Sequence, residues 1–131
     1  MNLNNNISRD DLIERAKELE CLYLVEEALA KYPIEKSLNK ITSIIPMGFR
    51  NTYNCMVSII FDEQIFNENS SFDNIDELGT AIIVEGQNRG YIKVMYPKHT
   101  FPEDDIVYLD QEIRLLNTIS RRISETIEKS D

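Results

Sequence analysis

The chain has 131 residues, of which 42% are apolar, and a formal net charge of −9. This length favours one domain with one core, spanning residues 1–131, and this apolar content excludes a chain that is disordered throughout. The acidic charge disfavours nucleic acid and anionic membranes as partners, because like charges repel.

The amino-terminal third predicts two helices. Residues 1–7 are polar and are expected to form a disordered lead, and Ser8 suits the N-cap of a helix over residues 8–32. Two apolar strips follow this helix at helical spacings. The first strip consists of Leu12, Ala16, Leu19, Tyr23 and Ala30, and the second of Leu22, Val25 and Leu29. Pro33 favours a break, after which residues 34–45 have the period of a shorter helix.

The period then changes to that of β-strands. The expected strands cover residues 53–61, 65–66, 78–85 and 91–96. Residues 67–76 are rich in Asn, Ser and Asp and predict a loop, and residues 86–90 predict the turn of a hairpin. Strands joined by short turns are antiparallel, so the predicted fold class is α+β with a central antiparallel sheet.

A long helix is predicted over residues 106–128. One apolar seam, interrupted once by Ser120, consists of Ile106, Leu109, Ile113, Leu116, Ile123 and Ile127. Leu115 and Ile119 form a second strip beside that seam. Doubled strips on both terminal helices predict contact with a second copy of the chain. The candidate residues of a homodimer interface are therefore Leu22, Val25, Leu29, Leu115 and Ile119.

The side chains that carry chemistry do not form a catalytic pattern. The one histidine, His99, stands beside Lys98 in a connector without an identifiable nucleophile or carboxylate partner, which favours a solvated loop histidine. Cys21 and Cys55 are interpreted as small buried side chains, with a disulfide between them as the alternative. No pair of His or Cys residues has metal-ligand spacing. We therefore expect no catalytic, metal-binding or cofactor-binding residues, and no cofactor.

The amino-terminal residues also lack the basic and apolar blocks of a signal peptide. No apolar run approaches the roughly 20 residues of a membrane span. Cytoplasmic localisation is therefore expected, without a membrane partner.

Several segments resemble a known family through their order and spacing. They are residues 19–23 on the first helix, 45–49 at the end of the second, 54–59 and 80–84 in strands, 90–96 in the hairpin, and 109–116 on the last helix. Together they resemble the small GAF-like domains of bacterial and archaeal sensor proteins, which often precede a histidine kinase core. The resemblance implies a GAF/profilin-like sheet with the first and last helices packed together on one face, commonly as a dimer bundle.

The resemblance implies a non-catalytic regulatory, sensory and dimerisation module in signal transduction. Its partners would be a second copy of the chain and a kinase or other output protein. Tyr96-Pro97 and Ile106 depart from the motif of the cyclic-nucleotide-binding members, so any ligand is expected to be neutral or mostly apolar. The alternative is a stand-alone adaptor that binds a partner protein through its helix face without a small-molecule ligand. An enzyme with an unrecognised site is a third hypothesis.

Overall fold

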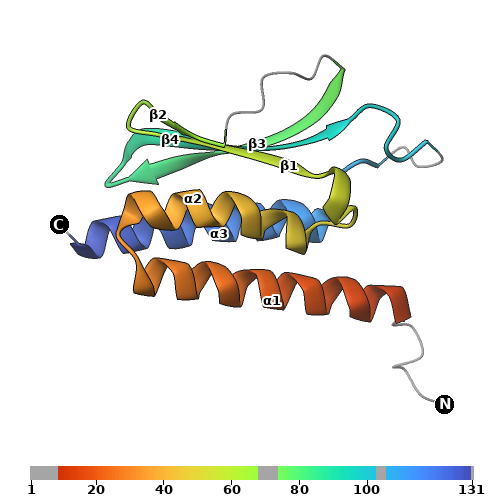
Figure 1. Cartoon of the computed structure of the whole chain (residues 1–131), viewed down its shortest axis with the longest axis horizontal. Coiled ribbons are helices and arrows are strands. Elements are labelled where there is room, and N and C mark those ends of the chain that lie inside the picture. Colours follow the sequence, from red (N-terminus) through yellow and green to blue (C-terminus); the bar gives the residue numbers. More distant parts are fainter. Residues whose placement is uncertain (1–8, 68–73, 103–105, 131) are drawn as a thin grey trace.

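Three α-helices lie on one side of a four-stranded antiparallel sheet (Figure 1). This computed structural model describes residues 9–67, 74–102 and 106–130, and the numbers of elements refer to that part of the chain. Helices α2 and α3 lie against the sheet, and α1 lies on the far side of those two helices. The predicted α+β class is confirmed, and so is the position of both terminal helices on one side of the sheet.

The helices begin and end near their predicted positions. They are α1 (Arg9–Lys31), α2 (Ile34–Ile44) and α3 (Asp110–Ser130). Pro33 separates the first two, as expected, and 3₁₀ turns follow α2 at Ile45–Gly48 and Thr52–Asn54. The last helix begins four residues later than predicted, and Ile106 is exposed ahead of it. The lead at 1–7 and the cap at Ser8 lie outside the described residues. No helix in the described ranges is long and apolar enough to cross a membrane.

The sheet has the strand order β2-β1-β4-β3. Its strands are β1 (Met56–Phe61), β2 (Gln64–Phe66), β3 (Ile75–Val84) and β4 (Gln87–Pro97). Strand β1 alternates between half-buried and buried positions, which is the pattern of a strand with one face against helices. Most of the loop predicted over residues 67–76 lies outside the described residues. Strand β3 begins at Ile75, so the last two residues of the predicted loop belong to that strand.

The β3–β4 turn differs from the prediction. The turn consists of Glu85 and Gly86, whose φ angles of 51° and 80° are those of a two-residue hairpin turn. Residues 87–90 belong to β4, so the predicted turn at 86–90 is wrong. Gly90 pairs with Phe61, and a Cβ atom at position 90 would lie 2.2 Å from the Ile60 carbonyl oxygen. The glycine therefore permits a close approach of two strands rather than a turn.

The last helix buries both of its apolar strips within the chain. Leu116, Ile123 and Ile127 are buried, and so are Leu115 and Ile119 of the second strip. Helix α3 contacts β3 on one side and α1 on the other, so it occupies the middle layer of the molecule. The second strip faces another element of the same chain rather than a second copy.

The two strips of α1 have the opposite orientation from the one predicted. Val25 and Leu29 are buried and Leu22 is half-buried, whereas Leu19 and Tyr23 of the first strip are 63% and 64% exposed. The predicted dimer interface is thus wrong, because its residues are not exposed to a second copy but pack inside one chain. These residues are Leu22, Val25, Leu29, Leu115 and Ile119. The turn after α2 packs closely against α1 and α3 in this orientation. Gly48 leaves room there for Cys21 and Leu115, which would lie 3.0 Å and 2.6 Å from a Cβ atom at position 48.

Candidate functional site

The exposed side of α1 is the most distinctive surface of the described structure. Its residues, here called the outer stripe, are Leu12, Ala16, Leu19, Tyr23 and Ala30, and all five are exposed. Successive members are four, three, four and seven positions apart, and Glu26 takes the place that would divide the last interval. This is the spacing by which a helix packs along a second helix in a coiled coil. Ile13, also exposed, widens the apolar surface at its amino-terminal end.

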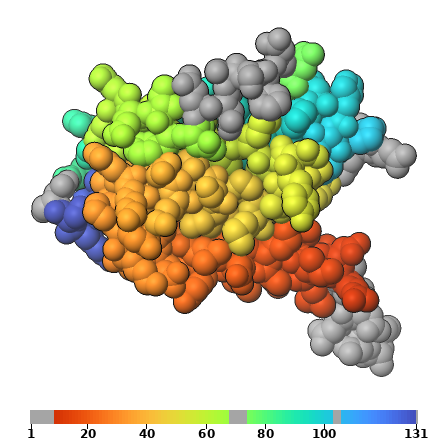
Figure 2. Space-filling model, viewed as in Figure 1, coloured from red at the N-terminus to blue at the C-terminus, as the bar shows by residue number. Residues whose placement is uncertain are grey.

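The layering of the molecule explains why the outer stripe is uncovered. The inner side of α1 packs on α2, on the turn at Ile45–Gly48 and on α3, and no helix or strand of the described residues lies beyond it. Figure 2 shows this helix (red to orange) along the lower margin of the molecule. Exposed apolar residues are ordinary when scattered, but a stripe of this length at heptad spacing indicates an interaction surface.

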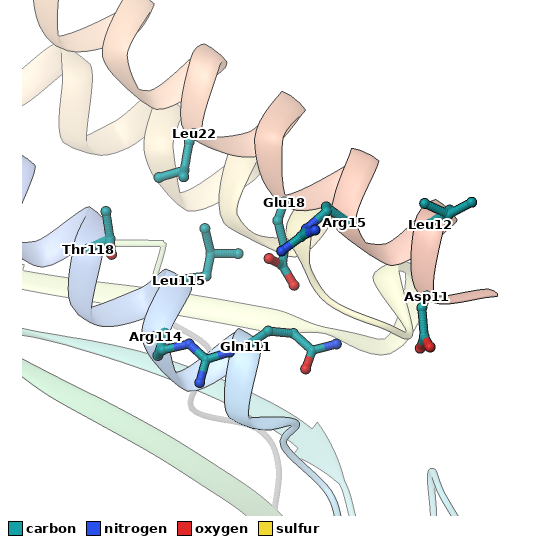
Figure 3. A pocket seen from close by; sticks show the side chains of 9 residues that line it. All are labelled: Asp11, Leu12, Arg15, Glu18, Leu22, Gln111, Arg114, Leu115 and Thr118. Carbon is teal, nitrogen blue, oxygen red and sulfur yellow. The ribbon is translucent and has the colours of Figure 1, made fainter. Parts of the chain in front are cut away.

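A groove borders the outer stripe between α1 and α3 (Figure 3). Its volume is about 540 Å³. Leu22 and Leu115 face one another across it, and Arg15 and Glu18 extend from α1 toward α3. The complete lining consists of Asp11, Leu12, Arg15, Glu18, Leu22, Gln111, Arg114, Leu115 and Thr118. Three leucines and four charged side chains thus line the groove, the mixture that an amphipathic helix can contact.

The charges of the groove influence one another. Burial raises the pKa of the Glu18 carboxyl, and the Glu112 carboxylate raises it further. The guanidinium groups of Arg114 and Arg15 oppose that shift. The groove thus holds two cations close to one partly buried carboxyl group.

Polar contacts hold α1 in place at two positions along its length. The Lys17 ammonium donates hydrogen bonds of 2.8 Å and 3.3 Å to the carbonyl oxygens of Phe49 and Arg50. Farther along, the Arg122 guanidinium binds the Glu26 carboxylate, with an Nε–Oε1 distance of 2.7 Å. A partner of Arg122 on α3 thus lies on α1 of the same chain.

Glu112 is a buried carboxyl group that the sequence prediction missed. It is 1% exposed and accepts hydrogen bonds from the backbone N–H groups of Leu109 (2.9 Å) and Arg50 (2.6 Å). Burial raises its pKa, and the two backbone donors oppose this shift. A Glu three residues after a helix cap is a recognisable signal, but the cap residue is Leu109 instead of Ser or Thr. Since both carboxylate oxygens are engaged by backbone groups, the contact serves to position α3.

The remaining candidate residues have structural surroundings. Cys21 and Cys55 are buried free thiols, and burial raises the pKa of each to about 12. His99 is exposed in the connector after β4, with a φ of 71°. In the described ranges, no group of three or more His, Cys, Asp or Glu side chains is placed to hold a metal ion.

The aromatic residues differ in their exposure to solvent. The buried ones are Phe49, Phe61, Phe66 and Tyr96. Tyr23 and Tyr53 are strongly exposed, and Tyr91 is partly exposed over Gly79.

Comparisons with protein-family models and with curated protein sequences give no match to this chain.

Proposed function

We propose that this protein is a non-catalytic, GAF-like regulatory and dimerisation module, in which two copies meet through α1. The observation that carries the proposal is the outer stripe, with Leu12, Leu19 and Tyr23 each more than half exposed. Pairing with a second stripe removes these side chains from water, and burial of apolar area stabilises by roughly 25 cal/mol per Å². The interface residues are thus Leu12, Ala16, Leu19 and Tyr23, which replace the set predicted from the sequence.

The regulatory part of the proposal is supported by the position of α1. This helix contacts α3 along the groove, and α3 contacts β3 of the sheet. A ligand or partner that moves α3 relative to α1 would change the geometry of the paired stripes. The output partner would be a kinase or another signalling protein in the cytoplasm, as the GAF-like resemblance implies.

The second candidate function is a stand-alone adaptor that uses the same stripe to bind a different protein. One observation favours it. Three hollows are lined by α3 together with α1 or β3, on the helical side of the sheet, which is the side that such an adaptor would use. An adaptor needs a helix face and no ligand cavity.

Light scattering on a sizing column at micromolar concentrations tests the dimer. The matched variants are Tyr23→Lys and Tyr53→Lys, because both tyrosines are exposed and only the first lies on the outer stripe. The wild type and Tyr53→Lys should have the mass of a dimer, and Tyr23→Lys should approach the monomer mass of 15.3 kDa. The circular dichroism spectra of all three should agree. A wild type that stays monomeric would refute the dimer and favour the adaptor.

A further inference from the structure

We infer that the two copies pack α1 against α1 in parallel and in register, with Arg15 of each copy facing Glu20 of the partner subunit. This inference rests on the dimer proposed above and adds the direction of the helices and the charges that determine it. It starts from the positions that flank the outer stripe.

The flanks of the outer stripe carry opposite charges. Arg15 directly precedes Ala16 and Glu20 directly follows Leu19, so they border the stripe on its two sides. Both side chains are exposed. Arg15 lies on the side of the groove, where Arg114 adds a second cation. In a parallel coiled coil, a residue on one flank meets the residue five positions later on the opposite flank of the partner helix. Arg15 and Glu20 are five positions apart.

The antiparallel arrangement brings together different flanking residues. There each flank meets the same flank of the other helix. With the stripes centred on one another, Glu20 would face Glu20 of the partner subunit, and Arg15 would approach Leu29, which is buried in its own chain. Like charges at flanking positions destabilise a pairing, and opposite charges favour it. The charges therefore select the parallel arrangement.

The stripe residues also suit an in-register parallel pair. Ala16 would meet Ala16 of the partner subunit, and Leu19 and Tyr23 would likewise meet their own copies. The small side chains at Ala16 let the two helix backbones approach closely near the amino-terminal end. The larger ones at Leu19 and Tyr23 supply the buried apolar area.

Disulfide cross-linking tests the direction of the helices. In an in-register parallel dimer, Ala16→Cys places two thiols side by side, and mild oxidation should give a covalent dimer at least about tenfold faster than a collision-controlled reaction. The control is Asn39→Cys on α2, an exposed position away from the stripe. The native Cys21 and Cys55 are buried and contribute little background.

Charge reversal gives a second, independent test. Arg15→Glu alone should weaken dimerisation by about three- to tenfold, and the double variant Arg15→Glu, Glu20→Arg should restore it. An antiparallel dimer would be insensitive to Arg15→Glu. A dimer by light scattering that neither cross-links through Ala16→Cys nor responds to Arg15→Glu would overturn the parallel arrangement while leaving the proposed function intact. A monomeric wild type would overturn both.

Discussion

The backbone N–H of Arg50 donates a 2.6 Å hydrogen bond to the Glu112 carboxylate, which lies 62 positions later in the chain. The other carboxylate oxygen accepts from Leu109, immediately before α3. One side chain thus fastens the start of the last helix to the segment that leads into β1. The same segment holds α1 through Lys17.

Replacement of Glu112 should therefore destabilise the fold strongly. Glu112→Ala leaves two backbone donors without their acceptor and should lower the free energy of unfolding by about 3 kcal/mol. Glu112→Gln retains one acceptor oxygen and should cost about half as much. Urea unfolding followed by circular dichroism measures both. Equal stability of Glu112→Ala and the wild type would show that the contact is dispensable.

The pH dependence of stability provides a separate test of Glu112. Because its pKa is raised in the folded state, folding favours the protonated form. The associated stability is fully present below the unfolded pKa of about 4.5 and is lost as the pH rises through the folded pKa. The stability of the wild type relative to Glu112→Gln should consequently fall as the pH rises above about 4.5. If the stability of the wild type relative to Glu112→Gln instead increased with pH, the raised pKa of the buried Glu112 carboxyl would be contradicted.

Two glycines should differ in their tolerance of one methyl group. A Cβ atom at Gly90 would lie 2.2 Å from the Ile60 carbonyl oxygen, whereas at Gly86 no atom lies within 4 Å. Gly86→Ala should cost about 1 kcal/mol, since its φ of 80° is unfavourable for alanine. Gly90→Ala should cost at least about 3 kcal/mol because the backbone of β1 must move. Thermal unfolding measures the stability of the two variants. A larger loss of stability in Gly86→Ala than in Gly90→Ala would contradict the close approach of β4 to β1.

Charges on the two apolar surfaces of the helices should have different consequences. Ile119 is fully buried in α3, so Ile119→Asp should unfold the protein, with a loss of at least about 4 kcal/mol. Leu19→Asp lies on the outer stripe and should leave the fold intact while it removes the dimer. Circular dichroism detects the unfolding of Ile119→Asp, and light scattering detects the loss of the dimer in Leu19→Asp. A folded, monomeric Ile119→Asp variant would instead support the interface predicted from the sequence.

The native thiols should be nearly unreactive. With pKa values of about 12, Cys21 and Cys55 hold only about one thiolate per ten thousand molecules at pH 8. Labelling by an aromatic disulfide reagent should be at least about a hundredfold slower in the native protein than in denaturant. The exposed Asn39→Cys variant supplies a fast-reacting control. Fast labelling of the wild type would contradict the burial of both residues.

The sequence predicted the helices and the antiparallel sheet of this fold correctly, but it did not predict which side of α1 faces the core. The break at Pro33 and the antiparallel sheet follow from local patterns, whereas the burial of both strips of α3 within one chain does not. Helix α1 is apolar on two sides, so its periodicity does not say which strip turns inward. In the observed orientation Gly48 makes room for Cys21 and Leu115, and these three residues come from distant parts of the chain. Such a contact depends on tertiary packing that no local spacing encodes.

The hairpin turn and Glu112 were missed for related reasons. Residues 86–90 contain two glycines and an asparagine, the residues of a turn, but Gly90 serves a contact with another strand. Glu112 has the spacing of a capping residue without the usual cap at Leu109. Its second partner, Arg50, is visible only in three dimensions.

The middle-layer position of α3 has a consequence for biosynthesis. Glu26 and Arg122, which join α1 to α3, are 96 positions apart. A chain emerges from the ribosome amino terminus first, so α1 and α2 are available long before α3. During that interval the side of α1 around Leu22 lacks the cover that Leu115 later supplies. The nascent chain therefore exposes two apolar sides of α1, whereas the finished protein exposes one. Packing of α3 against α1 thus limits association between neighbouring nascent chains.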